Sequence, residues 1–133
     1  MNIPEAAVEE NRRMTITEFL EARISEDEEV ARAASHQKVA GPFHGNWHHD
    51  SLHLSSMERV DAIHVARHDP ARVLAECAAK RAIIALHDYE WMGPDDAAGK
   101  GCEHDYEDWP CPTIRAIAAV YAHHPDYKQE WAL

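Results

Sequence analysis

Apolar side chains recur at helical spacing in three segments of the chain, and this periodicity constrains the fold more than any other feature of the sequence. In the first segment, TITEFLEARISEDEEVARAAS at residues 15–35, Thr15 and Glu18 have the spacing of a capping box at a helix start. The apolar face that follows consists of Ile16, Phe19, Leu20, Ile24, Val30, Ala31 and Ala34. The opposite face is acidic, so we predict an amphipathic helix whose apolar stripe needs a partner element.

The second segment, HDPARVLAECAAKRAIIALHD at residues 68–88, begins with a helix-start signal. Asp69 is a preferred N-cap residue, and Pro70 follows at the first helical position, where its missing N–H costs nothing. The predicted buried face contains Val73, Leu74, Cys77, Ile83, Ile84 and Leu86. We therefore expect a helix that runs from Pro70 to His87.

The third segment, CPTIRAIAAVYAHHPDYKQEW at residues 111–131, repeats this pattern with Cys111 as the N-cap and Pro112 at the first helical position. Pro125 ends the predicted helix, because proline cannot continue it. We expect Tyr127 and Trp131, which follow, to fold back onto the core as a final turn.

Residues 36–69, between the first two helices, contain helix-breaking glycine and proline and then short apolar alternations. Leu52 with Leu54, and Val60 with Val65 around Ile63, favour two short strands. The predicted fold is mainly α (α+β), with three main helices and a small antiparallel β-hairpin between the first and the second. Residues 1–13 are predicted to form a polar N-terminal extension, and residues 14–133 a single globular domain.

The charge distribution excludes one large class of partners. The net charge is −11, and residues 88–110 contain eight acidic residues and one lysine. A nucleic-acid-binding protein needs a basic stripe to replace phosphate counterions, and no such stripe is visible. The sequence also shows no signal peptide and no apolar run long enough to cross a membrane, so we expect a cytoplasmic protein without direct nucleic-acid or membrane contacts.

Four residues in and around the acidic loop carry side chains that bind zinc. His87 stands at the expected end of the second helix, Cys102 and His104 in the loop, and Cys111 at the start of the third helix. Zinc binds four ligands in a tetrahedron, and a structural site takes all four from the protein. The single residue between Cys102 and His104 is an unusual ligand spacing, so two alternatives stay open: an acidic loop with two ordinary thiols, and a disulfide between Cys102 and Cys111.

Histidines are also concentrated in FHGNWHHDSLHL, at residues 43–54. This segment contains His44, His48, His49, Asp50 and His53. With His64, they suggest a hydrolytic metal site, where a metal activates water and a histidine or carboxylate takes the proton. Adjacent residues on a strand point to opposite faces, so His48 and His49 would need a bulge to bind one ion. A solvated loop is the alternative interpretation.

Arg67 and His68 precede the predicted start of the second helix. The N–H groups at a helix N-terminus favour an anion such as phosphate, and Arg67 could add a bidentate contact. Against this anion-binding hypothesis, Asp69 as the cap would occupy the same donors.

Three blocks of the sequence together resemble a small family of domains of unknown function from actinobacteria and their phages. They are MTITEFLEARISEDE at 14–28, HVARHDPARVLAECAAKRAII at 64–84 and PCPTIRAIAAVYAHHPDYKQEW at 110–131. The resemblance implies an accessory protein from a phage or prophage-rich neighbourhood, with a small metal site made by a cysteine pair ahead of a third cysteine. This sequence departs from that pattern, because Cys102 and His104 stand where the pair is expected.

We therefore expect a non-enzymatic, phage-type or prophage-type accessory protein that binds and modulates a macromolecular partner, a protein in the first instance, and is stabilised by a structural zinc. Two alternatives stay open. One is a metal-dependent hydrolase or nuclease that uses His44, His48, His49 and His53. The other is a homo-oligomeric structural component that pairs through its first helix.

Overall fold

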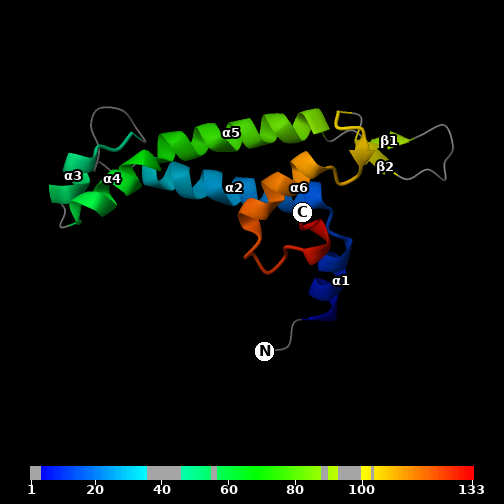
Figure 1. Cartoon of the computed structure of the whole chain (residues 1–133). Coiled ribbons are helices and arrows are strands. Elements are labelled where there is room, and N and C mark those ends of the chain that lie inside the picture. Colours follow the sequence, from blue (N-terminus) through cyan, green and yellow to red (C-terminus); the bar gives the residue numbers. More distant parts are fainter. Residues whose placement is uncertain (1–3, 36–45, 55–56, 88–89, 93–99, 103) are drawn as a thin grey trace. The chain divides into compact units, whose positions relative to one another are not determined.

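The computed structural model of the protein describes residues 4–35, 46–54, 57–87, 90–92, 100–102 and 104–133. The chain divides into two compact units, residues 1–23 with 81–133 (unit 1) and residues 24–80 (unit 2). The helices are α1 Glu5–Arg13, α2 Ile16–Ser35, α3 His49–Leu54, α4 Arg59–Arg67, α5 Pro70–His87 and α6 Pro112–Ala118 (Figure 1). The strands are β1 Glu90–Met92, β2 Lys100–Cys102 and β3 Glu107–Asp108, and the 3₁₀ turns are η1 Ala119–Tyr121 and η2 Gln129–Trp131. The two longest helices, α2 and α5, each contribute residues to both units.

Side-chain capping hydrogen bonds at α2 and α5, and a proline at the first position of α6, explain where the three predicted helices begin. Thr15 Oγ1 accepts a hydrogen bond from the Glu18 N–H at 3.1 Å, which caps α2 as predicted. Asp69 Oδ1 accepts from the Arg72 N–H at 2.9 Å and caps α5 in the same way. Cys111 is the N-cap of α6 and is followed by proline, so all three predicted helix starts are confirmed.

The protein is mainly α with a small antiparallel sheet, as predicted, but the predicted position of the β element is wrong. Residues 49–54 and 59–67 form α3 and α4, and the sheet lies between α5 and α6 in the order β1-β2-β3. Leu52 and Ala62 are buried on helical faces. Two or three alternating apolar residues do not distinguish a period of 2 from one of 3.6, which is why the hairpin was misplaced.

The core of unit 1 is built around Phe19, which is fully buried. Its ring centroid lies 5.1 Å from that of Trp131 and 6.1 Å from that of Tyr127. The predicted return of the final turn onto the core is therefore confirmed. Arg23 is buried beside this cluster, where its Nη1 contacts the His124 ring and lies 3.6 Å from Asp126 Oδ2.

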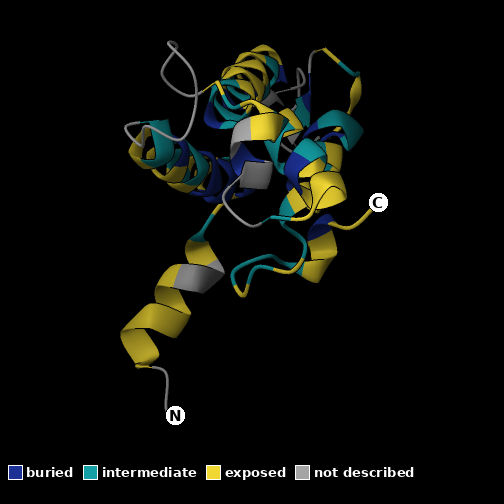
Figure 2. Ribbon diagram, turned by 90° about the vertical axis from the view of Figure 1, so that its left-hand side faces the viewer, coloured by how far each residue is buried: buried dark blue, intermediate teal, exposed yellow. Residues whose placement is uncertain are grey.

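The core of unit 2 contains Ile24, Ala31, Leu52, Ala62 and Cys77. The Cys77 thiol donates to the carbonyl oxygen of Ile24 at 3.9 Å, which joins α5 to α2 within this unit. Figure 2 colours each residue by how far it is buried. The residues of α1 whose burial is described are exposed. No helix among the described residues is long and apolar enough to cross a membrane.

Three residues predicted to pack in the core are exposed, one from each predicted helix, and Val120 of the third is 63% exposed. Val30 of α2 is 71% exposed and Leu86 of α5 is 62% exposed, so these assignments are wrong. Their sequence neighbours Ala31 and His87 are buried instead. In α5 the last buried position is therefore taken by a polar side chain, and the reason lies in the cluster that His87 joins.

Candidate metal centre

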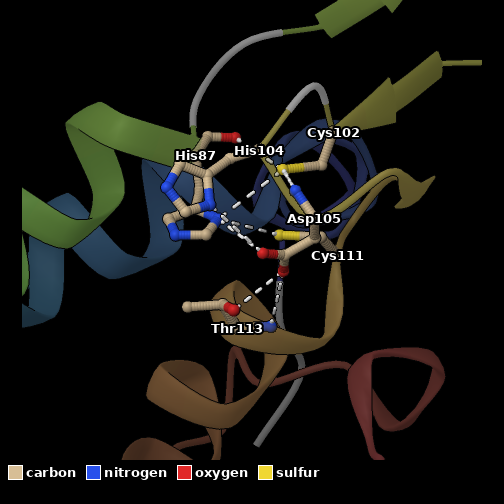
Figure 3. Close-up of polar contacts among 6 residues, drawn as sticks. All are labelled: His87, Cys102, His104, Asp105, Cys111 and Thr113. Carbon is tan, nitrogen blue, oxygen red and sulfur yellow. Dashed lines mark hydrogen bonds and ion pairs between the residues drawn. The ribbon is translucent and has the colours of Figure 1, made fainter.

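Four metal-binding side chains of unit 1 converge at one point (Figure 3). His87 is the last residue of α5, Cys102 is the last residue of β2, Asp105 follows in the turn, and Cys111 caps α6. One ligand atom from each of the four lies within 4.8 Å of all the others. The two sulfurs and the imidazole are buried, so the cluster is largely shielded from solvent.

Three distances from His87 Nδ1 to the other donors match the edges of a tetrahedron around one zinc ion. His87 Nδ1 lies 3.6 Å from Cys102 Sγ, 3.7 Å from Cys111 Sγ and 3.3 Å from Asp105 Oδ1. With Zn–S of about 2.3 Å and Zn–N or Zn–O of about 2.05 Å, neighbouring S and N ligands stand about 3.6 Å apart, and N and O about 3.3 Å apart. The arrangement is therefore compatible with metal binding without rearrangement of these three pairs.

The turn from Cys102 to Tyr106 is shaped around the Cys102 sulfur. The Asp105 N–H donates to Cys102 Sγ at 3.4 Å, and the Tyr106 N–H donates to the Cys102 carbonyl oxygen at 2.8 Å. Tyr106 adopts a left-handed φ of 55°, a conformation that glycine normally takes. The Asp105 N–H thus orients the sulfur, while the Tyr106 N–H closes the turn that carries the Asp105 carboxylate to the donor cluster.

Asp105 contributes its two carboxylate oxygens in two directions. Oδ2 accepts hydrogen bonds from Thr113 Oγ1 at 2.8 Å and from the Thr113 N–H at 3.4 Å, in the first turn of α6. Oδ1 faces His87 Nδ1 in the cluster. The hydrogen bond from the Thr113 hydroxyl is the main reason why the pKa of Asp105 is lowered, so the carboxylate stays ionised and available to a cation.

Cys111 has the opposite electrostatic situation. Burial raises the pKa of its thiol from 9.0 to about 12, and the neighbouring Cys102 and Asp105 add to the increase. The thiol is therefore protonated in the metal-free protein at neutral pH. A divalent cation reverses this preference, because a coordinating thiol is deprotonated by the metal. The carboxylate of Asp105 and the thiols of Cys102 and Cys111 can all become negatively charged, and a bound cation would compensate these charges.

The structure brings together three of the four predicted ligands, namely His87, Cys102 and Cys111, and places Asp105 among them. His104 stands outside this donor set. Its side chain is 57% exposed, and its ring lies over that of His87 with 4.3 Å between the centroids. Sequence reasoning missed Asp105, although Cys102 and Asp105 are separated by two residues, which is a normal ligand spacing on one turn.

Three of the residues proposed for a hydrolytic metal site in the histidine-rich segment lie close together. His48, His49 and Asp50 lie at the start of α3 with ligand atoms within 4.8 Å of one another. His44 and the side chain of His53 lie outside the part of the chain that the structure describes. The segment is helical rather than extended here, so the objection that adjacent strand residues face apart does not apply.

The Asp69 carboxylate accepts hydrogen bonds from N–H groups at the place where an anion is predicted to bind. One of its oxygens caps α5 through Arg72, and the other accepts from the Trp47 N–H at 3.1 Å. His68 Nδ1 lies 2.8 Å from the His64 carbonyl oxygen. This geometry supports the capping interpretation of the segment around Arg67 and His68.

The comparisons with known proteins identify a family without assigning an activity. No curated protein and no solved structure matches the chain. One family model, described as a family of unknown function (DUF6221), matches residues 13–133. The prediction of a domain of unknown function from the three sequence blocks is thereby confirmed. The match includes every residue of the donor cluster, and the chain belongs to the DUF6221 family of unknown function.

Proposed function

We propose that this chain is a non-enzymatic binding protein whose fold is stabilised by one structural zinc at His87, Cys102, Asp105 and Cys111. The observation that carries the proposal is the convergence of these four donors within 4.8 Å, with the three distances from His87 Nδ1 suited to one zinc ion. Two sulfurs with an imidazole favour zinc over magnesium or calcium, which prefer oxygen ligands. Four protein ligands complete the coordination shell, so no position is left for a substrate or an activated water.

A zinc at this point would connect three segments that are separate in the sequence. His87 belongs to the end of α5, Cys102 and Asp105 to the turn after β2, and Cys111 to the start of α6. The strands between these helices have two or three residues each. A sheet of such short strands is marginally stable by itself, and metal coordination supplies the missing free energy.

The same turn presents a surface suited to a protein partner. Tyr106 is 89% exposed, and the exposed carboxylates of Glu107 and Asp108 follow it. Tyrosine is enriched among residues that dominate binding energies, and the acidic neighbours favour a basic partner. The phage-type or prophage-type role rests on the sequence resemblance and is part of this proposal, as is the cytoplasmic location expected from the sequence.

Metal analysis of untagged protein, purified without chelators, tests the zinc site. We expect one zinc per chain by mass spectrometry, with zinc and thermal stability both lost in Cys102→Ser and Cys111→Ser. Cys77→Ser is the matched control, because it removes the third buried thiol, which lies outside the donor set. Full-length protein that folds without any bound transition metal would overturn the proposal.

A further inference from the structure

Unit 2 contains a second group of metal-binding side chains, at the start of α3. His49 Nε2 lies 3.2 Å from Asp50 Oδ1, and His48 Nδ1 lies 3.5 Å from Asp50 Oδ2. The two imidazole rings are stacked, with 4.4 Å between their centroids. Ligands at about 2.05 Å from one ion stand about 3.3 Å apart in a tetrahedron, so each imidazole lies at a suitable distance from one oxygen of the carboxylate. One ligand atom from each of the three residues lies within 4.8 Å of the other two.

We propose that His48, His49 and Asp50 form a second metal site, which binds a borderline divalent transition metal such as Ni²⁺ or Zn²⁺ reversibly from solvent. Two imidazoles and one carboxylate favour these ions, whereas the site lacks the oxygen donors that Ca²⁺ and Mg²⁺ require. The site contains no sulfur, which distinguishes its ligand chemistry from that of the buried cluster.

The exposure of this site determines how it exchanges metal. The side chains of His48 and Asp50 are 62% and 63% exposed, so water completes the coordination shell. His48 Nδ1 also accepts a hydrogen bond from the Asp50 N–H at 3.2 Å. In the metal-free protein this contact orients the ring. When an ion binds, it takes the place of the Asp50 N–H at the lone pair of His48 Nδ1. An exposed site of three protein ligands therefore binds more weakly than the buried cluster.

Another histidine pair in unit 2 provides the main competing explanation for metal uptake. The rings of His64 and His68 lie 4.5 Å apart on α4. His68 Nδ1 is hydrogen-bonded to the His64 carbonyl oxygen at 2.8 Å, so this nitrogen is the donor and only Nε2 remains for a metal. The group of three at α3 has a carboxylate in addition to two imidazoles, which makes it the stronger candidate.

Titration of Ni²⁺ into the full chain, with calorimetry and with zinc and nickel content measured by mass spectrometry, tests the second site. We expect one equivalent of Ni²⁺ to bind without release of zinc. In His49→Ala and Asp50→Ala the affinity should fall by at least about tenfold, since even changes to outer-shell partners of a metal ligand have effects of this size. His123→Ala and Asp61→Ala, which change exposed residues of the same types, are the matched controls.

Two results would overturn the second site: no Ni²⁺ uptake by the full chain, or Ni²⁺ affinity in His49→Ala and Asp50→Ala equal to that of their controls. The latter result would assign the uptake to other histidines, such as those of α4. The comparison between variants does not depend on zinc in the buried cluster, so failure of the zinc proposal would be recognised separately, by its own metal analysis.

Discussion

Asp105 is the residue that connects the donor cluster to helix α6. One of its oxygens faces His87, and the other accepts both hydrogen bonds from Thr113. Metal ligands that are oriented by such outer-shell partners bind more tightly, because the carboxylate does not have to be ordered when the ion arrives. The Thr113 hydroxyl should therefore affect zinc binding although it does not itself lie in the donor set.

Replacing Thr113 by valine removes this hydroxyl with little change in side-chain shape. We expect zinc affinity to fall roughly 10–100-fold in Thr113→Val. The pKa of Asp105 should also rise, since the Thr113 hydroxyl is the main cause of its lowered value. Competition with a chelator of known affinity measures the effect. Thr113→Ser retains the hydroxyl and is the control, and equal zinc affinity in the two variants would show that the contact has no role in metal binding.

At the residue level, the sequence predicted three of the four converging side chains. Cys102 and Cys111 could be recognised because the sequence contains only three cysteines, and His87 and Cys111 because they stand at predicted helix ends. Asp105 could not be selected from the composition, since eight acidic residues occur between 88 and 110. The choice depends on the turn after Cys102, whose left-handed residue is a tyrosine and gives no glycine signal.

At the level of elements, local signals made the helix starts predictable: side-chain to backbone caps at α2 and α5, and proline at the first position of α6. Each depends on residues within four positions of one another, so sequence contains the whole signal. The strands are different, because their pairing joins Glu90 to Cys102 and Gly101 to Asp108 through the backbone. None of the three strands has an alternating apolar face, and the sheet therefore left no pattern that could be read in advance.

Asp69 caps α5 through the Arg72 N–H and also accepts a hydrogen bond from the Trp47 N–H. We expect Asp69→Ala to lower the free energy of unfolding by about 1 kcal/mol, the usual effect of losing a helix N-cap. Urea denaturation monitored by circular dichroism measures this change. Asp61→Ala removes a carboxylate from the first turn of α4 and should have a smaller effect. Equal losses in both variants would mean that Asp69 acts only through its charge.

At the level of the whole molecule, the two candidate metal sites belong to different units. The buried cluster is made entirely by unit 1, and the His48, His49 and Asp50 site by unit 2. The description of residues 14–133 as one domain stays a prediction, because the described chain separates into two compact parts. Zinc in unit 1 should therefore slow amide hydrogen exchange there more than in unit 2.

Zinc binding should also be linked to proton release by the whole protein. In the metal-free protein, burial raises the pKa of Cys111 to about 12, so its thiol is protonated at neutral pH. Zinc binds the thiolate, so uptake must displace this proton, and the apparent affinity must rise with pH and fall as acid is added. Isothermal titration in buffers with different ionisation enthalpies measures the proton, because the observed heat then varies with the buffer. A heat independent of the buffer would mean that neither cysteine of the cluster releases a proton and that the ion is bound without thiolate ligands.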